Sequence, residues 1–330
     1  MKRPYPGLTP LVAALTTYLD NIARTSIVDA TLEDIRAARA TVYPTTPPFS
    51  WITGRVEPSV RIEEGTAPVR DGGSIPLRWY TPSGTKGGTP VLVFIHGGGW
   101  VQGSTRMYDP ICSHLAAELG IVVVSLDYRM APEHRAPVAA HDCIDAVRWL
   151  HEHGDHDIDR DRIGLSGDSA GGNLSAVVAQ ELRELRSAAG EPVIRHQALI
   201  YPATDLTLAS PSIDEHADGA ILTKPKILRF RELYLGDGPD APTLDDPILS
   251  PLFGDVTGVA PALVQTADLD PIRDDGLRYA EHLRAAGVDV RVTNYLGLPH
   301  GFASFPGVAP AGRQSRLELV TDIRRHLVGA

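Results

Sequence analysis

The stretch Gly164-Leu165-Ser166-Gly167-Asp168-Ser169-Ala170-Gly171-Gly172-Asn173 places a serine between paired glycines, in the pattern G-x-S-x-G. Arg162 and Ile163 lead into this stretch as the end of an apolar strand. Apolar residues then follow at the spacing of one helical face: Leu174, Val177, Val178, Leu182 and Leu185. A strand, a sharp turn and a helix are the context in which this pattern forms a nucleophile elbow. The sequence therefore predicts that Ser169 is a nucleophile.

Steric and electrostatic effects explain the residue types around Ser169. A serine at the apex of so tight a turn has a strained backbone, and glycines two positions away on each side avoid collisions between neighbouring side chains. The hydroxyl is then left exposed above the sheet. The helix that follows points its N-terminal amides and the positive end of its dipole at any oxyanion formed beside Ser169.

The composition limits the possible classes of protein. The chain has 330 residues, 43% of them hydrophobic and 22% charged, which is enough for one large α/β domain or two small ones. The net charge of −10 disfavours nucleic acid or an anionic membrane surface as a partner. Cys112 and Cys143 fall in expected helices, and we expect buried apolar residues there, not a disulfide or a metal site.

The N-terminus does not resemble a targeting segment. Met1-Lys2-Arg3 precedes an apolar run from Leu11 to Leu15, which is too short for a signal peptide and is followed by Thr16 and Thr17. No stretch approaches the ~18 to 20 apolar residues of a membrane span. We therefore expect a cytoplasmic protein with no integral membrane association.

Strand and helix patterns alternate along most of the chain. Residues 55 to 81 contain strand patterns with turn signals, which predict an antiparallel entry to a sheet. Further strands are expected at Val91–Ile95, Ile121–Leu126, Val193–Ile200, Ala262–Thr266 and Val288–Tyr295, and a last helix at Arg316–Val328. This alternation predicts a mostly parallel sheet with helices on both faces.

Two segments do not fit the alternation, and we expect them to form a helical cap. The first is an N-terminal helical segment (1–50), and the second is an excursion (206–250) with a helical pattern at Lys226–Leu235. The α/β core would then be built from 51–205 and 251–330. A cap would cover the carboxyl ends of the strands, where ligands bind in open α/β sheets.

A second motif, His96-Gly97-Gly98-Gly99-Trp100, directly follows the strand Val91–Ile95. Three glycines leave backbone N–H groups bare and allow a ligand to approach closely. Acyl-transfer enzymes need such donors to hold the oxygen of the tetrahedral intermediate. A strand followed by H-G-G-G, upstream of a nucleophile elbow, is typical of the oxyanion loop of esterases. The donors we expect are the amides of Gly98, Gly99 and Ala170, with Gly97 and His96 in supporting positions.

A serine nucleophile also needs a base and an acid that orients the base. In elbow enzymes these follow in the order Ser, Asp/Glu, His, each on a loop after a later strand. Of the downstream histidines, only His300 lies on a loop directly after an expected strand. Asp268 and Asp270 both follow the strand Ala262–Thr266, and we favour Asp270 with Asp268 as the alternative.

Together these motifs resemble the bacterial hormone-sensitive lipase-like esterases, a branch of the α/β-hydrolase superfamily. The similarity covers roughly residues 65 to 328, in family order, and its motifs are highly specific: His96-Gly97-Gly98-Gly99-Trp100, Asp127-Tyr128-Arg129-Met130-Ala131-Pro132-Glu133, Gly167-Asp168-Ser169-Ala170-Gly171-Gly172-Asn173, Asp268-Leu269-Asp270-Pro271-Ile272-Arg273-Asp274 and His300-Gly301-Phe302. Asp168 places the elbow in the G-D-S-A-G subgroup.

The resemblance implies an α/β-hydrolase fold with an eight-stranded sheet and a helical cap. It also implies that Asp270, which precedes Pro-Ile-Arg-Asp, is the acid of the triad. Asp168 and Glu133 are expected to support the site, and Glu133 to form a buried pair with Arg129. Trp100, Phe230, Tyr234 and Phe302 are candidates to line the substrate pocket or to pack in the core.

The resulting hypothesis is a serine carboxylesterase that needs no cofactor and acts on small-molecule esters with short to medium acyl chains. An amidase or lactonase on the same triad is the first alternative, and a non-catalytic ligand-binding scaffold is the second. Polar residues at His151, His153, Asp155, His156 and Asp157 lack a firm metal-ligand spacing, so we expect a solvated turn there. A homodimer through the edge strand Val288–Tyr295 is plausible.

Overall fold

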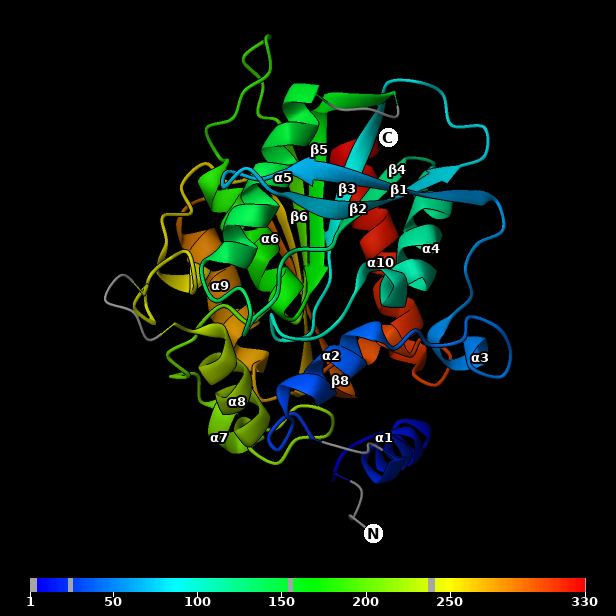
Figure 1. Cartoon of the computed structure of the whole chain (residues 1–330), viewed down its shortest axis with the longest axis vertical. Coiled ribbons are helices and arrows are strands. Elements are labelled where there is room, and N and C mark those ends of the chain that lie inside the picture. Colours follow the sequence, from blue (N-terminus) through cyan, green and yellow to red (C-terminus); the bar gives the residue numbers. More distant parts are fainter. Residues whose placement is uncertain (1–4, 23–25, 154–156, 237–240, 330) are drawn as a thin grey trace.

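The central feature of the computed structural model is one sheet of eight strands in the order β1-β2-β4-β3-β5-β6-β7-β8 (Figure 1). The structure describes residues 5–22, 26–153, 157–236 and 241–329. The strands are β1 (Val60–Pro68), β2 (Ser74–Pro82), β3 (Thr89–Ile95), β4 (Val122–Leu126), β5 (Ile158–Asp168), β6 (Ile194–Ile200), β7 (Ala262–Leu269) and β8 (Val290–Pro299). Strand β2 is antiparallel to both of its neighbours, and the pairs from β4 to β8 are parallel. The expected mostly parallel sheet with an antiparallel entry is confirmed.

Helices cover both faces of the sheet. They are α1 (Pro10–Ile22), α2 (Leu32–Ala40), α3 (Ser50–Thr53), α4 (Asp109–Leu119), α5 (Val138–His153), α6 (Ala170–Glu181), α7 (Ser212–Glu215), α8 (Lys224–Tyr234), α9 (Arg273–Ala285) and α10 (Pro310–Ile323). The core clusters place α5, α6 and α9 on one face and α4 and α10 on the other (Figure 1). None of the helices in the described ranges is both long and apolar enough to cross a bilayer.

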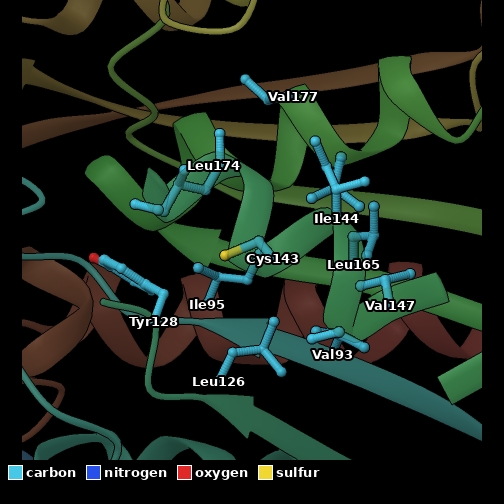
Figure 2. Packing of buried hydrophobic residues seen from close by; sticks show 14 of the residues in the cluster. Val93, Ile95, Leu126, Tyr128, Cys143, Ile144, Val147, Leu165, Leu174 and Val177 are labelled. Carbon is cyan, nitrogen blue, oxygen red and sulfur yellow. The ribbon is translucent and has the colours of Figure 1, made fainter. Parts of the chain in front are cut away.

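The central strands are apolar along their whole length because both of their faces are covered. Every residue of β4 is buried, and so is all of β3 after Thr89. Figure 2 shows side chains of β3, β4 and β5 packed against α5 and α6, with Cys143 among them. Cys112 and Cys143 are both buried, as expected from the sequence, and they form no disulfide bond with each other.

Some element boundaries differ from the expectation. The last helix begins at Pro310 instead of Arg316, and it continues into a π-helical turn at Arg324–Val328. Proline suits the first turn of a helix because the N–H that it lacks would have no partner there. Strand β8 starts two residues later than expected and continues to Pro299. It is the last strand of the sheet, and the homodimer through it stays a prediction.

The described parts of the N-terminal segment and of residues 206–250 lie at the end of the molecule where the parallel strands end, and Figure 1 shows α1, α2, α7 and α8 together there. The Tyr5 hydroxyl contacts His216 Nδ1 at 2.7 Å, so the two segments contact each other. Arg39 Nε donates to Val101 O at 2.7 Å, which joins α2 to the loop after β3.

The turn between β5 and α6 allows a very close approach of backbone to backbone. A Cβ atom on Gly171 would lie 1.9 Å from Ile95 O, and one on Gly167 would lie 2.4 Å from Gly171 O. No side chain fits at either position. The flanking glycines of the motif are thus needed for the contact between the first turn of α6 and the end of β3.

Replacing Gly171 with alanine is expected to destabilise the protein by about 1–3 kcal/mol, because the added methyl group must push β3 and α6 apart. Chemical denaturation would measure the change in the free energy of unfolding. Gly236→Ala is the control, since its Cβ would meet only ordinary contacts at 3.8 and 4.0 Å. Equal stabilities for the two variants would contradict the steric argument.

Candidate active site

Ser169, His300 and Asp270 form one chain of hydrogen bonds. Ser169 follows β5, Asp270 follows β7, and His300 follows β8. His300 Nε2 lies 3.0 Å from Ser169 Oγ, and His300 Nδ1 lies 2.7 Å from Asp270 Oδ2. Asp270 is fully buried, and its other carboxylate oxygen accepts the Ile272 amide at 3.0 Å. The structure therefore brings together three side chains that lie far apart in the sequence.

The alternative acid, Asp268, lies elsewhere. Its Oδ1 accepts the backbone amide of Leu298 at 3.3 Å. The other histidine in a nearby loop, His216, contacts Tyr5 and Arg273.

Ser169 has the strained backbone that its turn requires. Its φ of 53° and ψ of −118° lie outside the regions that L-residues favour. Its amide donates to Ile200 O at 2.9 Å, and its carbonyl accepts the Asn173 amide at 3.0 Å. These bonds hold the hydroxyl at the N-terminus of α6.

The glycine loop after β3 lies beside Ser169. Gly98, Gly99 and Trp100 have φ values of 119°, 62° and 60°. Within the part of the chain that the structure describes, the amides of Gly98, Gly99 and Ala170 donate no hydrogen bond to a loop acceptor. These amides are available to a ligand near the Ser169 hydroxyl.

His96 contacts this loop and the buried Tyr128. Its ring is stacked on Tyr128 at 4.4 Å, and its Nδ1 lies 2.8 Å from Gly97 O. The Tyr128 hydroxyl donates to His96 O at 3.0 Å. Complete burial lowers the pKa of His96, which keeps its ring neutral.

Asp168 connects the elbow to the glycine loop. Its Oδ1 accepts the Gly97 amide at 2.8 Å, and its Oδ2 accepts the Tyr108 hydroxyl at 3.1 Å. Burial raises the pKa of Asp168 to about 6. Tyr108 was not expected from the sequence: it ends a short 3-10 helix (Thr105–Tyr108), and no motif marks it.

The expected pair of Glu133 with Arg129 is wrong. Glu133 binds Arg36 and Arg39 of α2 at 2.9 and 3.0 Å, while Arg129 binds Asp142 and Asp71. The Glu133 carboxylate is partly exposed, so it is not a buried ion pair. Several acidic and basic side chains could pair with Glu133 or Arg129. The position of α2 in the folded chain decides that Glu133 pairs with Arg36 and Arg39.

A small cavity of about 40 Å³ opens beside Ser169. Its walls are mainly apolar, and the lining residues are Gly99, Trp100, Ser169, Ala170, Ala203, Asp205, Leu206, Leu208, Leu222, Ile227, Phe230, Arg231, Ile272 and Asp275. Of the four aromatic candidates, Trp100 and Phe230 line it. Tyr234 is buried behind Trp100, with the rings stacked at 4.5 Å, and Phe302 packs against Tyr201 and Tyr295.

Helix α8 packs directly on the glycine loop. A Cβ atom on Gly99 would lie 2.5 Å from the ring of Phe230, so only glycine leaves room for that ring. Together with the stacking of Tyr234 on Trp100, this contact makes α8 one wall of the cavity.

Asp275 forms a second buried acidic centre at the cavity wall. It contacts the Ser210 hydroxyl at 2.5 Å and the Asp205 amide at 3.3 Å, while the Asp205 carboxylate binds Arg278 at 2.7 Å. Burial, with the nearby Asp205 charge, raises the pKa of Asp275 to about 8. Asp275 is therefore protonated in the folded protein at neutral pH.

Potential metal ligands gather at one place among the described residues, away from Ser169. The ligand atoms of His196, Asp322 and His326 lie within 4.8 Å of one another. His196 Nε2 lies 2.7 Å from Asp322 Oδ2, and its ring is stacked on His326. These contacts join the start of β6 to the C-terminal helix. In the other histidine cluster, His151 contacts Arg160 O, and Asp155 and His156 lie outside the described residues.

Comparisons with known proteins agree with this fold. The family Abhydrolase_3, described as having the alpha/beta hydrolase fold, matches residues 92–304. The carboxylic ester hydrolase LipN of Mycobacterium tuberculosis is 44% identical over 261 residues, which are 77% of this chain and 68% of LipN. The ethyl acetate hydrolase of Pseudomonas putida is 34% identical over 280 residues, 84% of this chain and 86% of the relative.

Solved structures show the same fold over nearly the full length. The hyperthermophilic esterase from the archaeon Pyrobaculum calidifontis superposes with a TM-score of 0.82 at 34% identity, covering 97% of this chain and 98% of that one. The chain belongs to the α/β-hydrolase fold family. Within that family it is a carboxylic ester hydrolase of the hormone-sensitive lipase-like branch, as the sequence motifs indicated.

The protonated state of Asp275 makes stability depend on pH. Because its folded-state pKa is raised, its contribution is complete below the usual pKa of about 4 and is lost as the pH rises to about 8. Asp275→Asn resembles the protonated acid and removes this titration. Between about pH 5 and 8 the unfolding free energy of the wild type should fall relative to the variant, by at most about 1.4 kcal/mol per pH unit.

Denaturant unfolding at several pH values measures this difference. Glu281→Gln on the same helix is the control, because its side chain is 77% exposed and should keep the wild-type pH dependence. Parallel pH curves for the wild type and Asp275→Asn would show that Asp275 is ionised in the folded protein.

Proposed function

We propose that this protein hydrolyses carboxylic esters of short to medium acyl chains through an acyl-enzyme on Ser169. The observation that carries the proposal is the continuous hydrogen bonding from Ser169 Oγ through His300 to the buried Asp270. Such a chain supplies a nucleophile, a base and a group that orients the base.

In the first half of the reaction, Ser169 Oγ attacks the ester carbonyl carbon and its proton passes to His300 Nε2. Asp270 holds the Nδ1–H tautomer and stabilises the charged imidazolium. When the tetrahedral intermediate collapses, the bond to the alcohol oxygen breaks and His300 returns the proton to that oxygen. The alcohol leaves and the acyl group stays on Ser169.

In the second half, His300 takes a proton from a water molecule that attacks the acyl carbon. The bond to Ser169 Oγ then breaks, Oγ regains the proton from His300, and the carboxylic acid is released. In both halves the negative oxygen would be held by the amides of Gly98, Gly99 and Ala170. Their position beside Ser169, and the dipole of α6, support this role.

We propose that the N-terminal helices and residues 206–250 cap this site. The cavity wall formed by α8, with Phe230 against Gly99, supports this assignment. The small, mainly apolar cavity beside Ser169 suits a short or medium acyl chain better than a long one. The name of the Pseudomonas putida relative, an ethyl acetate hydrolase, is consistent with small esters.

Ser169→Ala should reduce kcat for p-nitrophenyl esters by roughly 10⁴- to 10⁶-fold, because among the described residues the Ser169 hydroxyl is the one that hydrogen-bonds His300. The series from acetate to palmitate, measured on both proteins, tests the nucleophile and the chain-length limit together. Activity that survives the substitution would remove Ser169 from this role. The matching anilides distinguish an amidase from an esterase.

Phe230→Ala should open the cavity and favour longer acyl chains. The ratio of kcat/KM for the longest to the shortest accepted ester is expected to rise by at least about tenfold. This ratio is insensitive to any general loss of activity. Leu228→Ala, an exposed residue of the same helix, is the matched control and should leave the ratio unchanged. An unchanged ratio in Phe230→Ala would show that this ring does not limit the substrate.

A further inference from the structure

The amide of Gly97 is held by two oxygen atoms from different parts of the chain. It donates to Asp168 Oδ1 at 2.8 Å and also lies 3.1 Å from the Tyr108 hydroxyl oxygen. The Tyr108 hydroxyl in turn donates to Asp168 Oδ2 at 3.1 Å. Three groups thus form a closed triangle of hydrogen bonds beneath the glycine loop.

The position of this triangle matters because of its neighbours along the backbone. Gly97 directly precedes the amides of Gly98 and Gly99, and Asp168 directly precedes Ser169. A Cβ atom on Gly97 would lie 2.6 Å from Asp168 Oδ2, so the loop and the carboxylate are in direct contact. The Asp168 carboxylate therefore links the glycine loop to the turn that contains Ser169.

We propose that Tyr108 is a positioning residue for the oxyanion hole, acting through Asp168 to hold the Gly98 and Gly99 amides at a fixed distance from Ser169. This inference rests on the proposed function. Preorganised donors stabilise a developing oxyanion only if they already lie where the negative oxygen forms. Loss of the Tyr108 hydroxyl should weaken transition-state binding more than substrate binding.

The charge state of Asp168 affects the same contacts. An ionised carboxylate accepts both hydrogen bonds, whereas a protonated one carries an O–H that competes with the Tyr108 hydroxyl as a donor. Burial raises the pKa of Asp168 to about 6, and the bonds from Tyr108 and Gly97 oppose that rise. The other titratable groups that interact with Asp168 are Tyr128, Tyr201, Cys112 and His300.

The tyrosine and cysteine side chains around Asp168 do not ionise in the acid range. Among these groups, only the Asp168 carboxyl changes its charge there. Burial raises the pKa of the Tyr108, Tyr128, Tyr201 and Cys112 side chains well above their usual values, so they stay protonated. As the pH falls through about 6, Asp168 gains a proton and the triangle loosens. Activity should therefore decline on the acid side as Asp168 gains its proton.

The test is Tyr108→Phe, which removes the hydroxyl and keeps the ring that packs near Phe94 and His96 at 5.6 and 5.9 Å. We expect kcat for a p-nitrophenyl ester to fall about tenfold with KM within about twofold, less than the cost of deleting an oxyanion donor outright. The inhibition constant of a trifluoromethyl ketone, whose adduct places an oxyanion beside the serine, should rise about tenfold. Because the Tyr108 bond lowers the pKa of Asp168, the acid limb should move to higher pH.

Asp168→Asn gives an independent readout. It keeps an oxygen that can accept the Gly97 amide but cannot ionise, so its acid limb should lose the part that comes from protonation of Asp168. Tyr279→Phe is the matched control, since it also removes a hydrogen-bonded hydroxyl from a buried tyrosine. The Tyr279 hydroxyl accepts a hydrogen bond from Gln180, near the C-terminal end of α6, and is not part of the triangle. This control variant should leave kcat, the inhibition constant and the pH profile unchanged.

Wild-type values of kcat, inhibition constant and acid limb in Tyr108→Phe would overturn the proposal. An acid limb in Asp168→Asn identical to that of the wild type would overturn the role of the Asp168 charge. Ester hydrolysis by Ser169→Ala would instead contradict the proposed nucleophile, whatever the Tyr108 variant shows, so the two failures can be told apart.

Discussion

The close contact between the first turn of α6 and the end of β3 is the constraint on which the rest of the site depends. Gly171 approaches Ile95 O so closely that no side chain can stand there. This contact places the turn after β5 beside the glycine loop after β3. The backbone strain at Ser169 is tolerated because the sheet and the helix on either side hold the turn in place.

Hydrogen bonds then fix the position of the glycine loop relative to the turn at Ser169. Asp168 reaches across from the elbow to Gly97, and Tyr128 reaches the carbonyl of His96. These groups are buried, where an unpaired polar atom would be costly, so each bond restricts the loop strongly. A loop of three glycines has little intrinsic preference for one conformation, and its surroundings supply the order that its sequence lacks.

The segments outside the alternating core complete the cavity. Asn173 in α6 donates to Ala203 O and Leu249 O, both at 2.7 Å, and so ties the excursion to the elbow. Helix α8 places Phe230 and Tyr234 on the glycine loop, and α2 reaches the same loop region through Arg39. The shape of the cavity thus comes from elements that are distant from Ser169 in the sequence.

The sequence by itself determined the fold class and the identity of the residues that meet at Ser169. Local patterns suffice for this, because G-x-S-x-G, the glycine loop and His300 each occupy a defined place after a strand. Only the tertiary structure decided the partners of Glu133, the contact of Tyr108 with Asp168 and the packing of Phe230 on Gly99. The physical reason is that Tyr108 and Asp168 stand 60 residues apart, and the periodicity of a strand or helix carries no information about such distant contacts.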